Sequence, residues 1–212
     1  MKYDMKNLFV IFKYGIFILS VIILISCVCP QQENTSQRLD KDFTMITPFV
    51  NIEDMGAINE AYSVNSNCPW GFEHRGIDFF SNKNLAPFQA VCPGKITVLN
   101  LWKNEGNGFW QVNLELEYNS NFSVIYAFEP MTSNPEHGQT QLDNILVSKG
   151  DEVSQGDVIG NLVYGTSGAH VHFGLKHNND DICPESYFTQ TARESIMLLL
   201  HLAWPGAHMC YE

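Results

Sequence analysis

Residues 147–160 read VSKGDEVSQGDVIG, and this stretch tells most about how the chain folds. A Gly-Asp pair occurs twice in it, at 150–151 and 156–157, and a valine follows each pair within two residues. Glycine permits tight turns because it adopts backbone conformations that other residues avoid. The spaced valine and isoleucine side chains can fill a small core. The run therefore predicts short β-strands joined by tight turns.

The same pattern continues on both sides of this run. From Gly71 onward, short apolar segments alternate with Gly, Asn and Asp, which is typical of a mainly antiparallel sheet. We expect hairpin turns at 104–108 (NEGNG) and 119–121 (NSN). Residues 189–204 form an apolar-rich helical pattern that ends at a Pro-Gly pair. The predicted fold class is mainly β, with an antiparallel sheet core and a short C-terminal helix. The predicted strands are 77–80, 95–102, 109–118, 122–128, 145–147, 158–163 and 169–175.

Two histidine motifs lie in this glycine-rich context, HRGID from His74 to Asp78 and HVH from His170 to His172. Residues i and i+2 of a strand face the same side, so His170 and His172 can point into one pocket. On a straight strand His74 and Asp78 would be ~13 Å apart, but Gly76 between them lets the chain bend. A zinc site needs roughly tetrahedral N and O donors with one position open. Either motif alone is common on protein surfaces, whereas both together favour a metal site.

These motifs resemble those of the lysostaphin-type (LytM-like) zinc endopeptidases of peptidoglycan. The shared patterns are HxGxD, Gly-Asp-x-Val-x-x-Gly and Thr-Ser-Gly-x-His-x-His-Phe, spread over about residues 71–175. The resemblance implies a β-fold of the duplicated-hybrid-motif kind and peptidoglycan peptides as substrate. It implies that His74, Asp78 and His172 bind one Zn²⁺ ion. It also implies that His170 acts beside the metal as a general acid or base, or as a donor to the transition state.

One segment departs from the family pattern. The family has a Tyr-x-His-Leu strand that carries a second catalytic imidazole, whereas this chain reads Tyr126-Ala127-Phe128-Glu129. Phe128 is therefore expected to replace that histidine. A positioned acid or base is typically worth ~10²–10⁴ in rate, so reduced activity is expected. Glu129 would face the opposite side of the strand from Phe128, and His137 is expected in an exposed loop.

Three functional interpretations follow from these residues. The leading one is a zinc-dependent endopeptidase that cleaves cell-wall peptides, because the predicted ligand set is complete. The alternative is a catalytically weak or inactive relative that binds the wall or regulates another wall hydrolase, because the second imidazole is missing. Gly-Asp runs also occur in biotinyl and lipoyl carrier domains, which display a lysine at a hairpin tip. No lysine is placed in that way here.

The N-terminal segment predicts export. Lysines precede a charge-free apolar run at 15–25 (GIFILSVIILI), about half the ~20 residues that a membrane-spanning helix needs. Residues 24–27 read LISC, which resembles a bacterial lipobox and predicts cleavage before Cys27 and lipidation of its thiol. An uncleaved anchor helix and a plain secretory signal remain alternatives. All of these place the rest of the chain outside the cytoplasm.

The predicted organisation is a signal peptide at 1–26, a polar tether at 27–42 and a metallopeptidase domain at 43–212 with its core at 71–175. The expected location is the bacterial cell envelope, with a lipid anchor holding the protein on a membrane and the domain facing the periplasm or the exterior. The 212-residue chain has a formal net charge of -11, which argues against a nucleic-acid partner.

Four cysteines follow the tether, namely Cys68, Cys92, Cys183 and Cys210. An even number of cysteines in an exported protein suggests disulfides, and four cysteines allow three pairings. The preferred pairing is Cys183 with Cys210, which would staple a C-terminal helical hairpin. Cys68 and Cys92 would then form the second bond.

Overall fold

The computed structural model describes residues 38–165 and 167–212. The predicted signal peptide, the lipidation site Cys27 and most of the predicted tether lie outside the described residues. Within the described part of the chain, no helix is long and apolar enough to cross a membrane.

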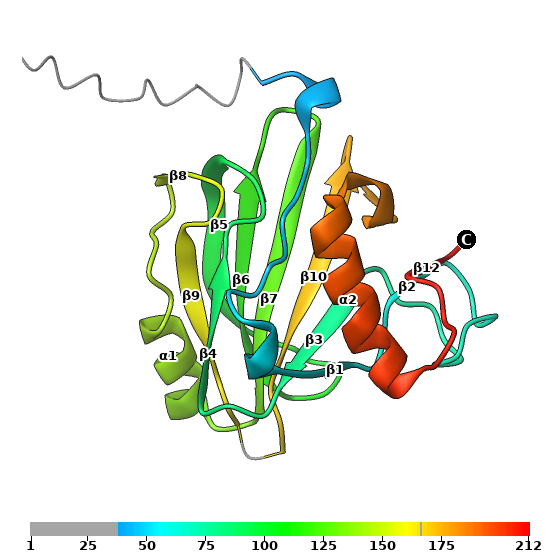
Figure 1. Cartoon of the computed structure of the whole chain (residues 1–212). Helices are drawn as coiled ribbons and strands as arrows, with labels where there is room; N and C mark the ends of the chain where they lie inside the picture. The colour runs from blue at the N-terminus through cyan, green and yellow to red at the C-terminus, as the bar shows by residue number, and fades with distance from the viewer. Residues whose placement is uncertain (1–37, 166) are drawn as a thin grey trace, which may run out of the picture. The chain divides into compact units, whose positions relative to one another are not determined.

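An eight-stranded sheet forms the centre of the fold, with its strands in the order β1-β3-β10-β7-β6-β5-β8 and β11 paired to β10 (Figure 1). Every pairing in this sheet is antiparallel, which confirms the predicted fold class. The strands are β1 (Met55–Ile58), β3 (Ile77–Ser81), β5 (Gly94–Lys103), β6 (Trp110–Glu117), β7 (Phe122–Thr132), β8 (Glu152–Val153), β10 (His170–His177) and β11 (Asp180–Ile182).

Two smaller sheets complete the strand structure. Strands β4 (Leu85–Gln89) and β9 (Val158–Val163) pair antiparallel, whereas β2 (Tyr62–Ser63) and β12 (Cys210–Tyr211) pair in parallel. The β4–β9 pair covers one face of the large sheet. There the Phe88 ring of β4 lies 5.7 Å from that of Phe128, and the hydroxyl of Tyr126 donates to the carbonyl of Gln89. The apolar core lies between these layers.

In the part of the chain that the structure describes, two α-helices pack on the sheets. Helix α1 (Pro135–Asp143) lies against β6 and β7, and α2 (Gln190–Ala203) lies against β1 (Figure 1). Each begins at a side-chain cap, because Asn134 accepts a hydrogen bond from the Glu136 amide and Thr189 accepts one from the Ala192 amide. The short C-terminal helix was predicted from the sequence and is confirmed. The described residues also form three 3₁₀ turns, η2 (Asp40–Asp42), η3 (Ile52–Asp54) and η4 (Glu185–Tyr187).

Several elements differ from the sequence prediction. Residues 145–147 are not a strand, since only Ile145 forms an isolated bridge, to Gly160. Helix α1 occupies residues that were expected to form a loop, and His137 lies within it, half-buried. Strand β4 was missed because it contains Pro87, a residue that usually argues against a strand.

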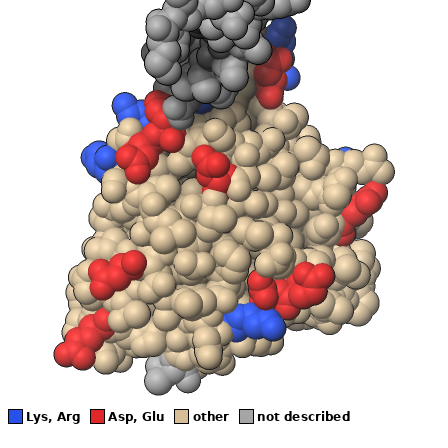
Figure 2. Space-filling model, turned by 60° about the vertical axis from the view of Figure 1, so that its left-hand side comes forward, with Lys and Arg blue, Asp and Glu red and all other residues tan. Residues whose placement is uncertain are grey.

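The surface is sparsely charged on the face shown in Figure 2. Acidic side chains are scattered over an otherwise uncharged surface there, and lysine and arginine side chains are fewer. This distribution agrees in sign with the formal net charge of -11.

Candidate metal centre

The register between strands β3 and β10 brings two of the predicted ligands together. His172 is paired directly with Asp78 across this antiparallel ladder, so both side chains project from the same face of the sheet. His74 lies three residues before β3 and is held by Ser63 of β2. The amide of each residue donates to the carbonyl of the other, at 3.0 Å from His74 and 2.7 Å from Ser63.

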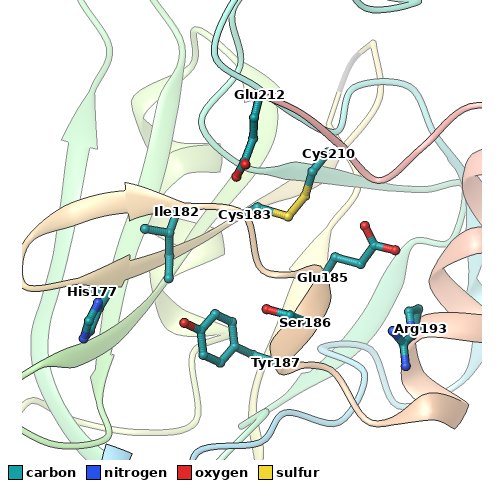
Figure 3. Close-up of a pocket in the computed structure, with 9 residues that line it drawn as sticks. All are labelled: His177, Ile182, Cys183, Glu185, Ser186, Tyr187, Arg193, Cys210 and Glu212. Atoms are coloured by element: carbon teal, nitrogen blue, oxygen red, sulfur yellow. A yellow bond between two sulfur atoms is a disulfide. The ribbon is translucent and has the colours of Figure 1, made fainter.

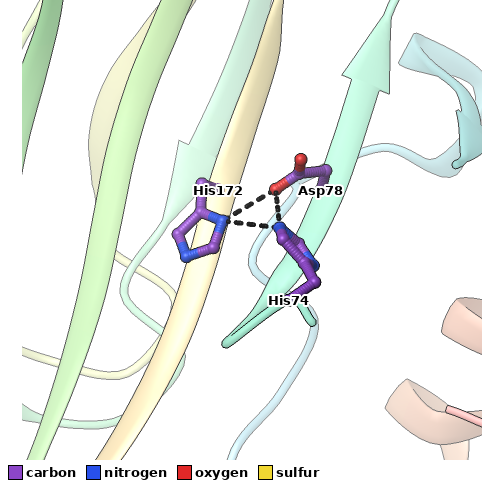
Figure 4. Close-up of side chains that lie close together, drawn as sticks. All are labelled: His74, Asp78 and His172. Atoms are coloured by element: carbon purple, nitrogen blue, oxygen red, sulfur yellow. Dashed lines mark hydrogen bonds and ion pairs between the residues drawn. The ribbon is translucent and has the colours of Figure 1, made fainter. Parts of the chain in front are cut away.

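The side chains of His74, Asp78 and His172 converge at one point (Figure 4). His172 Nδ1 lies 2.9 Å from Asp78 Oδ1 and 3.1 Å from His74 Nε2, and that nitrogen lies 3.2 Å from the same carboxylate oxygen. Atoms bound tetrahedrally to one zinc ion are about 3.3–3.6 Å apart. Each pair of ligand atoms thus needs to separate by only about 0.1–0.7 Å to hold such an ion. The donor set fits a zinc ion.

The tautomer of His74 is set by its second ring nitrogen. Its Nδ1 lies 3.2 Å from the carbonyl oxygen of Ala61, an acceptor, so Nδ1 carries the proton when the ring is neutral. The lone pair of Nε2 is then directed at Asp78 and His172. Orientation of a ligand ring by a backbone carbonyl is a common feature of metal sites.

The glycine of the HRGID motif makes room for the cluster. A Cβ atom on Gly76 would lie 2.5 Å from Cε1 and 2.6 Å from Nε2 of His172, and 2.6 Å from the carbonyl oxygen of Phe173. These distances are too short for any side chain. The glycine was expected to let the chain bend, and it also allows the His172 ring to pack directly against the backbone.

The cluster favours a charged carboxylate. Burial alone would raise the pKa of Asp78, but the hydrogen bonds from His172 and His74 outweigh it and hold this pKa well below its usual range. Burial would lower the pKa of His74, yet the hydrogen bond and charge of Asp78 raise it overall. The carboxyl groups of Glu60 and Glu129 interact electrostatically with Asp78. Burial raises the pKa of both groups, and the negative charge of Asp78 raises each pKa further.

His170 lies beside the cluster and is not one of its three members. Its Nε2 is 3.6 Å from Asp78 Oδ2 and 3.6 Å from Glu129 Oε2. Its Nδ1 is buried without a hydrogen-bond partner, and the ring stacks on Phe80 at 4.7 Å. Only Nε2 can therefore exchange a proton with a ligand in this position. The acid–base role given to His170 stays a prediction.

The residue of β7 that faces the cluster is Glu129. The ladder pairs Glu129 with His170 and Phe128 with Val171, so Phe128 projects from the opposite face. Phe128 is fully buried and packs on Phe88. The sequence placed Phe128 at the site, in the position of a catalytic histidine. That expectation is wrong, because the Phe128 side chain faces the core and not the cluster. Sequence reasoning also missed Glu60, which is separated from both motifs by more than ten residues.

A groove of about 440 Å³ opens beside the cluster on the same face of the sheet. His172 and Glu129 line one part of it, and the carboxamides of Asn100, Gln111 and Asn113 line another. Gln111 is only 7% exposed, and its Oε1 is buried without a partner. No lysine or arginine is among the described residues that line this groove. Its polar groups can bind a peptide backbone.

A larger cavity, about 570 Å³, contains none of the three cluster residues (Figure 3). It is lined in part by the disulfide between Cys183 and Cys210, the pairing that was preferred from the sequence. The expected bond between Cys68 and Cys92 is wrong, because both are free thiols. Cys92 is fully buried in the core, whereas Cys68 donates a hydrogen bond to the Phe72 carbonyl.

Comparison with solved structures finds similar proteins. One is a zinc-containing peptidase from Vibrio cholerae, with 23% identity over 66% of this chain and 38% of that chain, and a TM-score of 0.47. Another is Helicobacter pylori Csd3, with 20% identity over 74% of this chain and 38% of that chain, and a TM-score of 0.48. A third is lysostaphin, with 21% identity over 76% of this chain and 60% of that chain, and a TM-score of 0.40. The chain spans 38% of the length of each of the first two.

No curated protein matches the chain. Residues 72–184, more than half of the chain, match the family model described as peptidase family M23. This range contains both histidine motifs and the Gly-Asp run, so the resemblance to lysostaphin-type peptidases is confirmed. The chain belongs to peptidase family M23.

Proposed function

We propose that this protein is a zinc-dependent endopeptidase that acts on peptides of the bacterial cell wall. The observation that carries the proposal is the His74–Asp78–His172 cluster, whose ligand atoms lie 2.9–3.2 Å apart in a member of a peptidase family. A structural ion pair would need only one histidine beside Asp78. Two imidazole nitrogens 3.1 Å apart at one carboxylate are better explained by a shared cation.

His74 Nε2, Asp78 Oδ1 and His172 Nδ1 would hold the ion. Bound zinc would polarise the scissile carbonyl group and lower the pKa of water. His170 can hold or release a proton at Nε2, since its Nδ1 is enclosed. The carboxamides of Gln111 and Asn113 can bind the main chain of an extended peptide and direct it towards His172.

A wall-binding or regulatory protein with weak or no hydrolysis is the second candidate. The observation that favours it is that β7 presents the carboxylate of Glu129, and not an imidazole, towards the cluster. A peptidase and a binding protein would both hold zinc and both occupy the groove. They differ only in whether peptide bonds are broken.

The test is to incubate the zinc-loaded protein, purified in detergent, with isolated peptidoglycan and to measure new free amino groups and new reducing ends. An endopeptidase releases amino groups without reducing ends, loses this activity with a chelator and regains it with zinc. Bound protein without new amino groups would favour the binding role. New reducing ends alone would contradict a peptidase.

We also propose that Cys27 is acylated and holds the protein on a membrane of the bacterial cell envelope, facing the periplasm or the exterior. The LISC sequence at 24–27 supports this. Cys27→Ala should move the protein from the membrane fraction to the soluble fraction. Unchanged fractionation would point to a retained hydrophobic segment instead.

A further inference from the structure

Glu129 and His170 form a cross-strand pair at the boundary between the cluster and the groove. They are directly opposite each other on β7 and β10, and Glu129 Oε2 lies 3.6 Å from His170 Nε2. Glu129 also lines the groove together with His172. The pair therefore adjoins the space that a peptide must enter to reach the ligand atoms.

The position of Glu129 is unfavourable for a residue that serves the fold alone. Its side chain is only 16% exposed, and among the described residues its one ion-pair partner is His170. A carboxylate removed from water destabilises a protein unless it is paired. No lysine or arginine of the described groove lining compensates its charge. The structure thus places a second, largely buried carboxylate next to His170.

The His170 ring is held between two carboxylates at equal distance. Nε2 lies 3.6 Å from Asp78 Oδ2 on one side and 3.6 Å from Glu129 Oε2 on the other. Asp78 is also a member of the cluster, so a ring drawn fully to Asp78 would compete for that carboxylate. Glu129, which lines the groove, provides the opposing attraction.

We propose that Glu129 is a positioning residue for His170, which keeps Nε2 facing the groove and away from Asp78. This inference rests on the proposed function, since the orientation of His170 matters only if a peptide is processed there. It differs from the sequence expectation, in which the site position of β7 was assigned to Phe128. The carboxylate of Glu129, with His170, supplies the polar groups on this side of the cluster.

The test compares the wild type with Glu129→Ala and Glu129→Gln, and with Glu105→Ala as a control at an exposed site of the β5–β6 turn. Each zinc-loaded full-length protein carries ¹⁵N-labelled histidine, and the His170 signals are identified by their loss in His170→Gln. Ring ¹⁵N shifts report the environment of Nε2, independently of hydrolysis. Zinc content, kcat and KM for peptidoglycan peptides are measured in parallel.

Glu129→Ala should change the His170 ring shifts, keep zinc, and lower kcat by about 10- to 100-fold with little change in KM, the range seen when an orienting partner is lost. Glu129→Gln should recover part of kcat, because its carboxamide oxygen still carries a partial negative charge near His170 Nε2. Unchanged His170 shifts in Glu129→Ala would overturn the inference, as would changed shifts with an unchanged kcat. If the wild type does not hydrolyse peptides while the shifts still change, the proposed function fails but the positioning of His170 by Glu129 stands.

Discussion

Gly76 and His172 are packed so closely that no side chain fits between them. A Cβ on Gly76 would lie 2.5 Å from Cε1 and 2.6 Å from Nε2 of the imidazole. The first histidine motif thus contributes more than its two ligands, because its glycine determines where the ligand from the second motif can lie. The two motifs form one structural unit across the β3–β10 pair.

Gly76→Ala should therefore displace the His172 ring and weaken metal binding. We expect overpacking to lower the free energy of unfolding by about 1–3 kcal/mol. Zinc affinity should fall by tenfold or more, and each factor of ten corresponds to about 1.4 kcal/mol of binding free energy. Zinc titration and urea unfolding measure both effects. Gly174→Ala on the same strand β10 is the matched control, since its Cβ would meet no atom closer than 3.6 Å. Equal zinc affinity in the two variants would contradict this account.

Phe128→His should not restore activity. Phe128 is fully buried and packs on Phe88, so a histidine there would place an imidazole in the apolar core, away from the cluster. Leaving a buried polar group without partners costs about 1–3 kcal/mol. Urea unfolding should show this loss, and hydrolysis should not rise. Faster hydrolysis with unchanged stability would mean that residue 128 reaches the site after all.

The Cys183–Cys210 disulfide should affect the metal centre from a distance. Cys210 and Tyr211 of β12 pair with Tyr62 and Ser63 of β2, and Ser63 holds the backbone of His74 through two hydrogen bonds. We expect a Cys183→Ser/Cys210→Ser double variant to lose about 2–4 kcal/mol of stability and to bind zinc more weakly. Denaturant unfolding and zinc titration test this.

The free thiol Cys68 supplies the control for the disulfide variant. Cys68→Ser keeps a hydroxyl that can donate to the Phe72 carbonyl, so both stability and zinc affinity should be close to those of the wild type. Weaker zinc binding in the double variant alone would support the connection from β12 to His74. If the double variant binds zinc as tightly as the wild type, the disulfide stabilises the C-terminal segment only.

Zinc binding should weaken as the pH falls. The hydrogen bond and charge of Asp78 raise the pKa of His74 in the metal-free protein, and zinc needs an unprotonated Nε2. Protons therefore compete with zinc already above the usual histidine pKa of about 6.5. The stability of the metal-free protein depends on pH in the opposite direction. Protonated His74 stabilises the fold at low pH, and this contribution is lost as the pH rises through the raised pKa of His74. Zinc titrations across this range should show affinity that rises with pH; a flat profile would contradict it.

The sequence predicted the cluster well because its ligands lie in short motifs. His170 and His172 share a face by the two-residue period of a strand, and the bend at Gly76 before β3 brings His74 back to Asp78. The β7 residue was misplaced because the Tyr-x-His-Leu pattern does not show which face of the strand meets the core. Val124, Tyr126 and Phe128 are all fully buried, so their shared face is the core and Glu129 must face away from it.

Other elements could not be predicted from local patterns. Strands β2 and β12 have two residues each and exist only because the C-terminal segment returns to pair with Tyr62 and Ser63. Helix α1 did have a readable signal, since Asn134 followed by Pro135 is a common helix start. The helix has few apolar residues, so no helical apolar pattern marks it in the sequence.

The most direct test of the account measures bound zinc and peptidoglycan hydrolysis on the same preparations of the wild type, His172→Ala and the exposed-site control His201→Ala. The account predicts about one zinc ion per chain and release of new amino groups in the wild type and in His201→Ala, with both lost in His172→Ala. A folded wild type without zinc, or hydrolysis that persists in His172→Ala, would contradict it.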